Sequence, residues 1–201
     1  MTTSRGRPRE FDRERVLDGA MDAFWRNGAG ATTTRDLERA LGINPSSLYN
    51  AFGSKDGLIA EVLGRYRERM DAHVLAPLAD ATGGLEAIDD FFARLADWLT
   101  RDGRRGCLVS RLVAEGGDHG ETVTRMIRDH GRGLRAGLRS ALARAAASGE
   151  IPAATRERRL EVLTGMVLGL SLAAQGSSGA AGVRRIADAD RREIASWSGR
   201  G

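Results

Sequence analysis

Two short helices joined by a tight turn are the feature of this sequence that most constrains its fold. Thr33 and Asp36 have the spacing of a capping box, and the apolar stripe that follows them stops at Gly42. Asn44 can cap another helix and Pro45 suits its first position, so a second helix begins directly after the glycine. This pattern predicts a helix-turn-helix.

The helix after the turn has one apolar side and one polar side. Leu48 and Phe52 fall together on a helical wheel and predict the side that packs on the other helices. That packing is needed because a helix of about two turns is not stable by itself. The opposite side and its flanks are predicted to face outward and carry Ser46, Ser47, Tyr49 and Asn50.

A short helix with this polar side has the dimensions to enter the major groove of DNA. There Asn50 can pair with an adenine edge, and the hydroxyl groups can contact bases or phosphates. Arg35 in the preceding helix is placed for a guanine or a phosphate, and Lys55 at the next helix start for a phosphate. The same pattern also fits an ordinary solvent-facing side of a helical bundle.

Further helices are predicted on both sides of this unit. One runs from Asp12, its N-cap, to Asn27 and stops at Gly28. Another begins after Ser54 and continues toward Pro77. Helical stretches then follow at about 85 to 101, 106 to 115, 119 to 147, 153 to 175 and 184 to 197. Because no strand pattern is present, the predicted fold is all-α.

The charge of the chain gives only weak support for a nucleic-acid partner. The formal net charge is +4, and the isoelectric point of about 10.1 follows from arginines that hardly titrate. Position is more informative, because Arg5, Arg7 and Arg9 lie in an N-terminal stretch that has no apolar residue after Met1. This stretch is predicted to be a cationic arm.

The single cysteine and the lengths of the apolar runs indicate the cellular compartment of the protein. Cys107 cannot form an intrachain disulfide, which fits a reducing compartment. The basic N-terminus lacks the apolar stretch of a signal peptide, and the longest apolar run, 163–174, is too short to span a bilayer. We therefore expect a cytoplasmic protein with no membrane partner.

The stretch "TTTRDLERALGINPSSLYNAFGSKDGLI" closely resembles the DNA-binding signature of TetR-family transcriptional regulators, and the arm "RGRPREF" resembles the same family. The resemblance extends from residue 5 to about residue 66 and keeps Gly42, Phe52 and the Ser54 cap in register. One departure is that Pro45 and Ser46 replace a basic and a small residue of many relatives. The resemblance implies DNA contacts at Arg5, Arg7, Thr34, Arg35, Ser46, Ser47, Tyr49, Asn50 and Lys55.

The resemblance also implies a domain plan and a mechanism. Together with the predicted helices it implies a flexible basic arm (1–10), a helix-turn-helix DNA-binding domain (11–54), a connecting helix (55–82) and a helical ligand-binding and dimerisation domain (83–201). A homodimer of this kind represses by binding a pseudo-palindromic operator with recognition helices roughly 34 to 36 Å apart. A small-molecule ligand that favours another spacing releases the DNA, with a coupling of about 1 to 3 kcal/mol.

Bulky apolar side chains in the C-terminal helices are candidates for the ligand cavity, although such residues more often belong to an ordinary core. The candidates are Phe91, Phe92, Leu95, Trp98, Cys107, Leu112, Met126, Met166 and Leu170. The stretch from Leu160 to Ala174 has apolar residues on several faces, and Gly165, Gly169 and Ser171 permit close approach of another helix. Together with the helix at 184–197, this stretch is the predicted dimer interface.

Cys107 has two interpretations. In the segment "RRGCLV" it lies near a helix start behind Arg104 and Arg105, which can lower the pKa of a thiol and favour thiolate chemistry. A similar Gly-Cys-Leu segment occurs in a subgroup of TetR-like regulators, some of which respond to oxidants or electrophiles, so an electrophile is a possible inducer. Alternatively, a cysteine beside Leu108 and Val109 is a small buried core residue.

Other classes of protein fit the sequence less well. A thiol-dependent enzyme would have to use Cys107 with His73, His119 or His130, but no spacing among them implies a shared site. The scattered histidines likewise predict no metal site, and no cofactor is expected. An architectural DNA-binding protein without ligand control would show a steep salt dependence but little preference for sequence.

Overall fold

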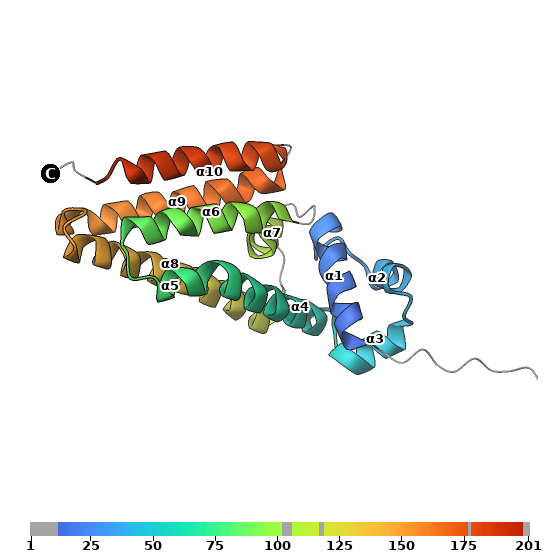
Figure 1. The fold of residues 1–201 in the computed structure, drawn as a ribbon. Coiled ribbons are helices and arrows are strands. Elements are labelled where there is room, and N and C mark those ends of the chain that lie inside the picture. Colours follow the sequence, from blue (N-terminus) through green and yellow to red (C-terminus); the bar gives the residue numbers. More distant parts are fainter. Residues whose placement is uncertain (1–11, 102–105, 117–118, 177, 199–201) are drawn as a thin grey trace, which may run out of the picture.

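The computed structural model describes residues 12–101, 106–116, 119–176 and 178–198. Within these ranges the chain forms helices joined by turns and short loops and has no strand, so the all-α prediction is confirmed. A small group of N-terminal helices lies at one end of a longer helical body (Figure 1). Of the helices in these ranges, none has the length and apolar character needed to cross a lipid bilayer.

The N-terminal helices begin at the capping residues that the sequence indicates, and the first two end at the predicted glycines. They are α1 (Arg13–Asn27), α2 (Thr34–Leu41), α3 (Pro45–Phe52) and α4 (Lys55–Met70). The Asp12 side chain accepts a hydrogen bond from the N–H of Arg15 at 3.1 Å, and Gly28 ends α1 with a φ of 87°. The Ser54 hydroxyl accepts from the N–H of Gly57 at 3.0 Å. The predicted starts of α1 and α4 are thus confirmed.

The turn between α2 and α3 also has the predicted capping groups. Thr33 and Asp36 form both hydrogen bonds of the capping box, and Gly42 ends α2 in the left-handed region with a φ of 64°. The Asn44 side chain accepts a hydrogen bond from the N–H of Ser47 at 2.8 Å. Because these groups satisfy backbone donors and acceptors at the helix ends, α3 begins after a turn of only residues 42–44.

One apolar core extends from the head, which we define as residues 12–54, into the rest of the chain. In the head, Leu48 and Phe52 of α3 are 1% and 7% exposed, and Leu37 of α2 is fully buried. Burying a side chain of this size contributes about 1.5 to 3 kcal/mol. These contacts supply the packing that an eight-residue helix needs to stay formed.

A π-helical turn lies in the helix that connects the head to the body, which we define as residues 71–198. This turn, η1 (Asp71–Leu75), follows α4 directly and leads into α5 (Ala76–Asp80). It precedes Pro77, which has no N–H to donate to a regular α-helical hydrogen bond. The chain stays helical through the proline to Asp80.

The remaining helices of the body follow this connecting helix along the chain. They are α6 (Leu85–Thr100), α7 (Leu108–Glu115), α8 (Gly120–Ala147), the short 3-10 turn η3 (Ala153–Thr155), α9 (Arg156–Gln175) and α10 (Gly179–Ala195). Helix α8 packs on α4 and α9, whereas α10 packs on α6 and α9. The last helix begins at Gly179, earlier than the predicted start at about 184. The prediction missed its first turn because the small residues there form no apolar stripe.

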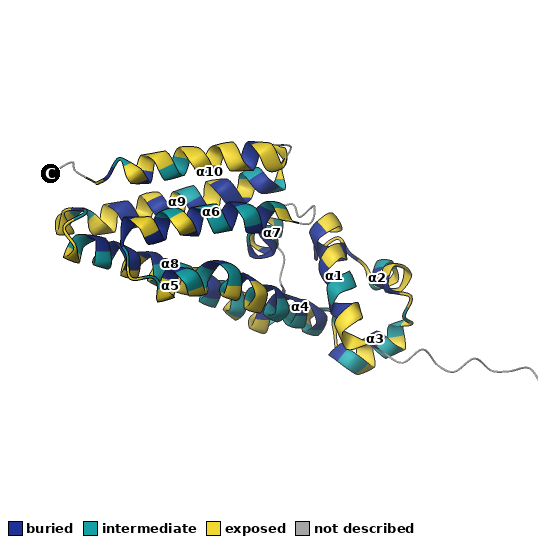
Figure 2. Cartoon of the chain, viewed as in Figure 1, coloured by how far each residue is buried: buried dark blue, intermediate teal, exposed yellow. Residues whose placement is uncertain are grey.

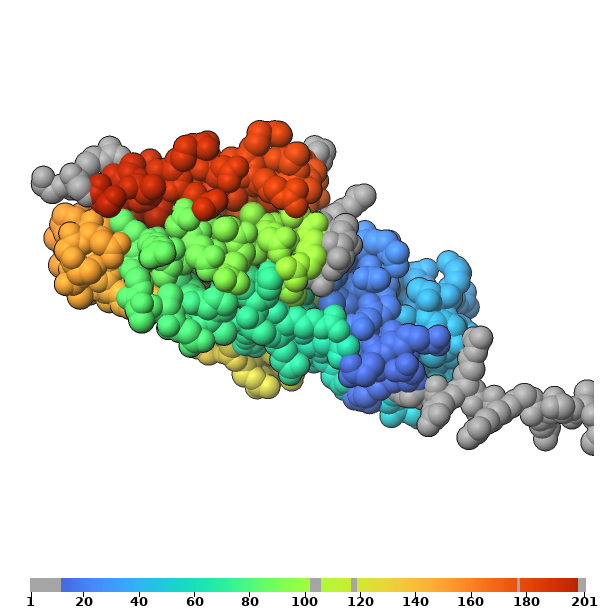
Figure 3. Space-filling model, viewed as in Figure 1, coloured from blue at the N-terminus to red at the C-terminus, as the bar shows by residue number. Residues whose placement is uncertain are grey.

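The distribution of burial follows this arrangement. Buried residues line the inner sides of the helices, and α10 carries a largely exposed outer side (Figure 2). In the space-filling view the head forms a distinct lobe beside the body, and α10 and α6 cover one face of the body (Figure 3). The head meets the body at a seam where α1 contacts α7, and α4, which connects the two, also contacts α7.

Candidate DNA-binding surface and ligand cavity

Helix α3 presents a polar side to solvent. Ser46, Tyr49 and Asn50 are exposed, and Ser47 is half-buried. The hydroxyl of Ser46 donates to the Asn44 side chain at 2.8 Å, which ties it to the helix cap. Within the described ranges, no hydrogen bond joins the side chain of Tyr49 or Asn50 to another part of the chain. These two side chains are therefore available to a partner.

Arg13 holds α3 from the side opposite its polar face. Its guanidinium donates to the carbonyl oxygen of Ala51 at 3.2 Å and lies 4.7 Å from the centre of the Phe52 ring. It also pairs with Glu61 of α4. No local sequence pattern indicates this role of Arg13, because its partners lie in two other helices.

Three further residues predicted to contact DNA lie in the first turns of α2 and α4. Thr34 is half-buried and Arg35 is exposed, both in the first turn of α2. Lys55 donates a hydrogen bond from Nζ to the carbonyl oxygen of Gly30 at 3.2 Å, so it contacts the loop between α1 and α2. Arg5 and Arg7 lie outside the described residues.

A cavity of about 380 Å³ lies in the body between α4, α6, α7, α8 and α9. Most of its wall is aliphatic, and its polar groups come from Cys107, Ser110, His130, Ser171 and Gln175. No Asp, Glu, Lys or Arg side chain is among the described residues that line it. Such a cavity suits a small, uncharged molecule.

The structure brings two of the nine predicted cavity residues, Leu95 and Cys107, to the wall of this cavity. Phe91, Phe92, Trp98, Leu112 and Leu170 are instead buried in the core outside its wall. Met126 and Met166 are half-buried and also lie outside the wall. Among the residues that sequence reasoning missed, Met70 and His130 reach the cavity from α4 and α8, and neither carries a local signal of that position.

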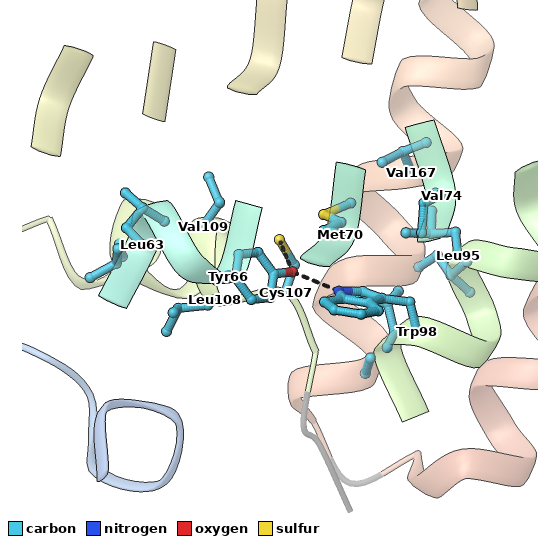
Figure 4. Packing of buried hydrophobic residues seen from close by; sticks show 14 of the residues in the cluster. Leu63, Tyr66, Met70, Val74, Leu95, Trp98, Cys107, Leu108, Val109 and Val167 are labelled. Atoms are coloured by element: carbon cyan, nitrogen blue, oxygen red, sulfur yellow. Dashed lines mark hydrogen bonds between the residues drawn. The ribbon is translucent and has the colours of Figure 1, made fainter. Parts of the chain in front are cut away.

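Cys107 belongs to a buried chain of hydrogen bonds (Figure 4). The indole of Trp98 donates from Nε1 to the hydroxyl of Tyr66 at 3.1 Å, and this hydroxyl donates to Sγ of Cys107 at 3.3 Å. Cys107 is 4% exposed and immediately precedes α7. His130 interacts with the thiol from α8. The cysteine is therefore both a buried residue and part of the cavity wall.

The surroundings of the thiol favour its ionised form. Burial raises the pKa of Cys107, but hydrogen bonding and charge interaction with His130, together with the Tyr66 hydroxyl, lower it below its ordinary value. Burial raises the pKa of Tyr66 well above its ordinary value, so its hydroxyl remains a donor. Arg104 and Arg105, the sequence-based reason for a reactive thiol, lie outside the described residues.

Comparison with known proteins identifies the family. Residues 16–62 match the family described as bacterial regulatory proteins, tetR family, and residues 84–189 match the tetracyclin repressor-like C-terminal domain. This chain belongs to the TetR family. The resemblance noted in the helix-turn-helix is thus confirmed, and the second match extends it through most of the body.

Individual repressors and solved TetR regulators match this chain over different lengths. The transcriptional repressor ComR of Escherichia coli K12 is 35% identical over 176 residues, which cover 86% of this chain and 83% of ComR. BdcR from the same organism is 46% identical over 61 residues, 30% of this chain and 31% of BdcR. A cysteine mutant of the TetR regulator CifR, solved with a 26-base-pair operator, has 29% identity and a TM-score of 0.81, covering 96% of this chain and all of that one.

These matches assign this TetR-family chain to the DNA-binding transcriptional repressors. A thiol-dependent enzyme would need a histidine beside Cys107. The structure places His130 there, whereas His73 contacts Asp97 and His119 contacts a backbone carbonyl. In the described part of the chain, no three side chains among His, Cys, Asp and Glu gather as they would around a metal ion.

The lowered pKa of the thiol in this TetR-family protein can be measured by its rate of alkylation. The rate of reaction of Cys107 with iodoacetamide should rise with pH at a midpoint below that of free cysteine, because the thiolate is the nucleophile. His130→Ala removes the neighbour that lowers the pKa most, so the midpoint should move to higher pH. His119→Ala is the control, and equal midpoints in the two variants would contradict the role of His130.

Proposed function

We propose that this repressor acts in the cytoplasm as a homodimer that binds a pseudo-palindromic operator and is released when a small molecule occupies the cavity or modifies Cys107. The observation that supports this most strongly is the position of Cys107, with its lowered pKa, at the start of a helix on the cavity wall. The domain plan inferred from the sequence, with boundaries after residues 10, 54 and 82, is part of the proposal.

In this proposal the polar side of α3 contacts the bases of the operator. Tyr49 and Asn50 are exposed and carry a ring and an amide that can contact base edges in a major groove. Asn50 is assigned to adenine, because the carboxamide can both accept a hydrogen bond from the N6 amino group and donate one to N7. The similar CifR chain was solved with double-stranded operator DNA, which supports the same use of this head. The contacts to phosphates and neighbouring bases are assigned to Arg5, Arg7, Thr34, Arg35, Ser46, Ser47 and Lys55.

Helices α9 and α10 supply the proposed dimer interface. Leu168 and Leu172 are 61% and 66% exposed, which is unusual for large apolar side chains on the same helix. Gly165 and Gly169 share this side of α9 by their helical spacing and have open space where a Cβ would be, so another helix can approach closely. Leu168 and Leu172 also line the cavity, so a partner subunit packed there would cover its apolar mouth.

The ligand is assigned from the chemistry of the cavity. The wall has no charged Asp, Glu, Lys or Arg side chain among its described residues, and removing a charged ligand from water without a partner is costly. An uncharged, mainly apolar molecule therefore fits, and one with an electrophilic carbon or an oxidising group can react with Cys107. Such a ligand would bind one spacing of the two heads more tightly than another. The difference between these two affinities would set how far the equilibrium between the spacings shifts.

Substitution of Asn50 tests the DNA contact. Asn50→Ala should weaken operator binding by about 1 to 3 kcal/mol, roughly 5- to 150-fold, because the paired base loses its bidentate partner. Binding to random DNA at the same salt concentration should change little. The measurement is fluorescence anisotropy with an operator mapped by footprinting, and the exposed Asn27→Ala is the matched control. Equal affinity of the unaltered protein for operator and random DNA would favour an architectural protein.

A bulky charge on the exposed side of α9 tests the dimer. Gly169→Arg should give a monomer that still folds, because a Cβ at this position meets no atom of its own subunit, whereas the long charged side chain blocks a second helix. Gly133→Arg makes the same change at an exposed glycine of α8 that also has open space, and should remain dimeric. Light scattering after size-exclusion chromatography measures the mass, and a dimeric Gly169→Arg protein would exclude this interface.

Alkylation tests the role of the thiol in release. N-ethylmaleimide should release operator from the unaltered protein, and because Cys107 is the only cysteine of the sequence, the modified site is unambiguous. Cys107→Ser should bind operator normally and stay bound after the same treatment. Release of Cys107→Ser at the rate of the unaltered protein would show that the thiol is not the target and leave reversible ligands as inducers. Turnover of a thiol-reactive substrate by the unaltered protein would instead favour the enzyme alternative.

A further inference from the structure

Glu115 connects the body to the head. It is the last residue of α7, yet its carboxylate reaches the loop between α1 and α2. One carboxylate oxygen accepts a hydrogen bond from the N–H of Ala29 at 3.2 Å, and the other accepts from the N–H of Gly30 at 2.9 Å. A charged acceptor that binds two neighbouring amides fixes both the position and the orientation of the loop.

Other hydrogen bonds occur along the same seam. The indole Nε1 of Trp25 donates to the carbonyl oxygen of Gly106 at 3.1 Å, directly before Cys107. Arg111 of α7 donates to the carbonyl oxygen of Arg26 at 3.5 Å and lies 3.3 Å from the Glu115 carboxylate. Both ends of α7 therefore hold the C-terminal end of α1 or the loop that follows it.

The loop is shaped to admit the carboxylate. Gly28 has a φ of 87°, which favours glycine, and a Cβ placed there would lie 2.5 Å from Oε1 of Glu115. On the other side of the loop, Lys55 donates to the carbonyl oxygen of Gly30. The loop is thus held between Glu115 of the body and Lys55 at the start of α4.

We propose that Glu115 is a positioning residue for DNA binding, which sets the angle of the head on the body and thereby the distance between the two α3 helices of a dimer. The inference rests on the proposed homodimer and operator. The loop held by Glu115 leads directly into α2, so a rotation there is carried through the rigid head to α3. A head held in advance at the binding angle loses less freedom when both heads enter successive grooves.

The position of Glu115 separates this role from that of a core residue. The side chain of Glu115 is 21% exposed and belongs to the body. Helix α3 is instead held by the burial of Leu48 and Phe52 and by Arg13, which also pairs with α4. Removing the carboxylate leaves those contacts in place. The head should then remain folded but become free to change its angle.

The test compares a complete operator with a duplex in which one half-site is scrambled. The operator is the palindrome that the unaltered protein selects from random DNA. Glu115→Ala should bind the complete operator about tenfold more weakly, a typical effect of a coupled element, but the half-site duplex within about twofold of the unaltered protein. Glu115→Gln keeps one acceptor oxygen, so its affinity for the complete operator should lie between those of Glu115→Ala and the unaltered protein. Glu121→Ala removes the same charge at an exposed position of α8 and should bind both duplexes normally.

Three results would overturn the inference. An equal loss on both duplexes would mean that the head itself is damaged. Unchanged or tighter binding of the complete operator by Glu115→Ala would mean that the contact does not hold the binding angle. If the unaltered protein binds both duplexes equally, the proposed dimeric operator binding fails first and takes this inference with it.

Discussion

The side chain of Tyr66 joins the head of the molecule to its body. It is fully buried, and its ring packs edge-on against Trp25 of α1 with 5.4 Å between ring centroids. Its hydroxyl accepts a hydrogen bond from Trp98 of α6 and donates one to Cys107 beside α7. Leaving a buried polar group unsatisfied costs about 1 to 3 kcal/mol, so separating these partners is unfavourable. The head, the cavity wall and the thiol therefore share one buried contact.

Helix α3 is kept in place by the burial of Leu48 and Phe52 and by the guanidinium of Arg13 across the Phe52 ring. These contacts lie within the head, whereas the head meets the body at its seam with α7. Trp25 and Glu115 lie on that seam, one on each side.

The two interpretations of Cys107 are compatible in the folded protein. Its burial is typical of a core cysteine, but its neighbours His130 and Tyr66 lower the pKa of the thiol more than burial raises it. A thiol in plain hydrocarbon would have a raised pKa and little reactivity. Tertiary packing, which brings α4 and α8 to the start of α7, thus decides whether this cysteine is inert.

The sequence by itself determined the features that depend on neighbours within about four residues, because capping and helical periodicity act over that distance. It predicted the caps at Thr33 and Asn44, the outward polar side of α3 and, through its signature, the TetR family. Only the tertiary structure decided which side chains line the cavity and which residues join head and body. Phe91 proved to be core, His130 reached the thiol, and Glu115 met an amide 85 residues away. Such contacts depend on how the side chains of separate helices interlock, and no local pattern encodes that packing.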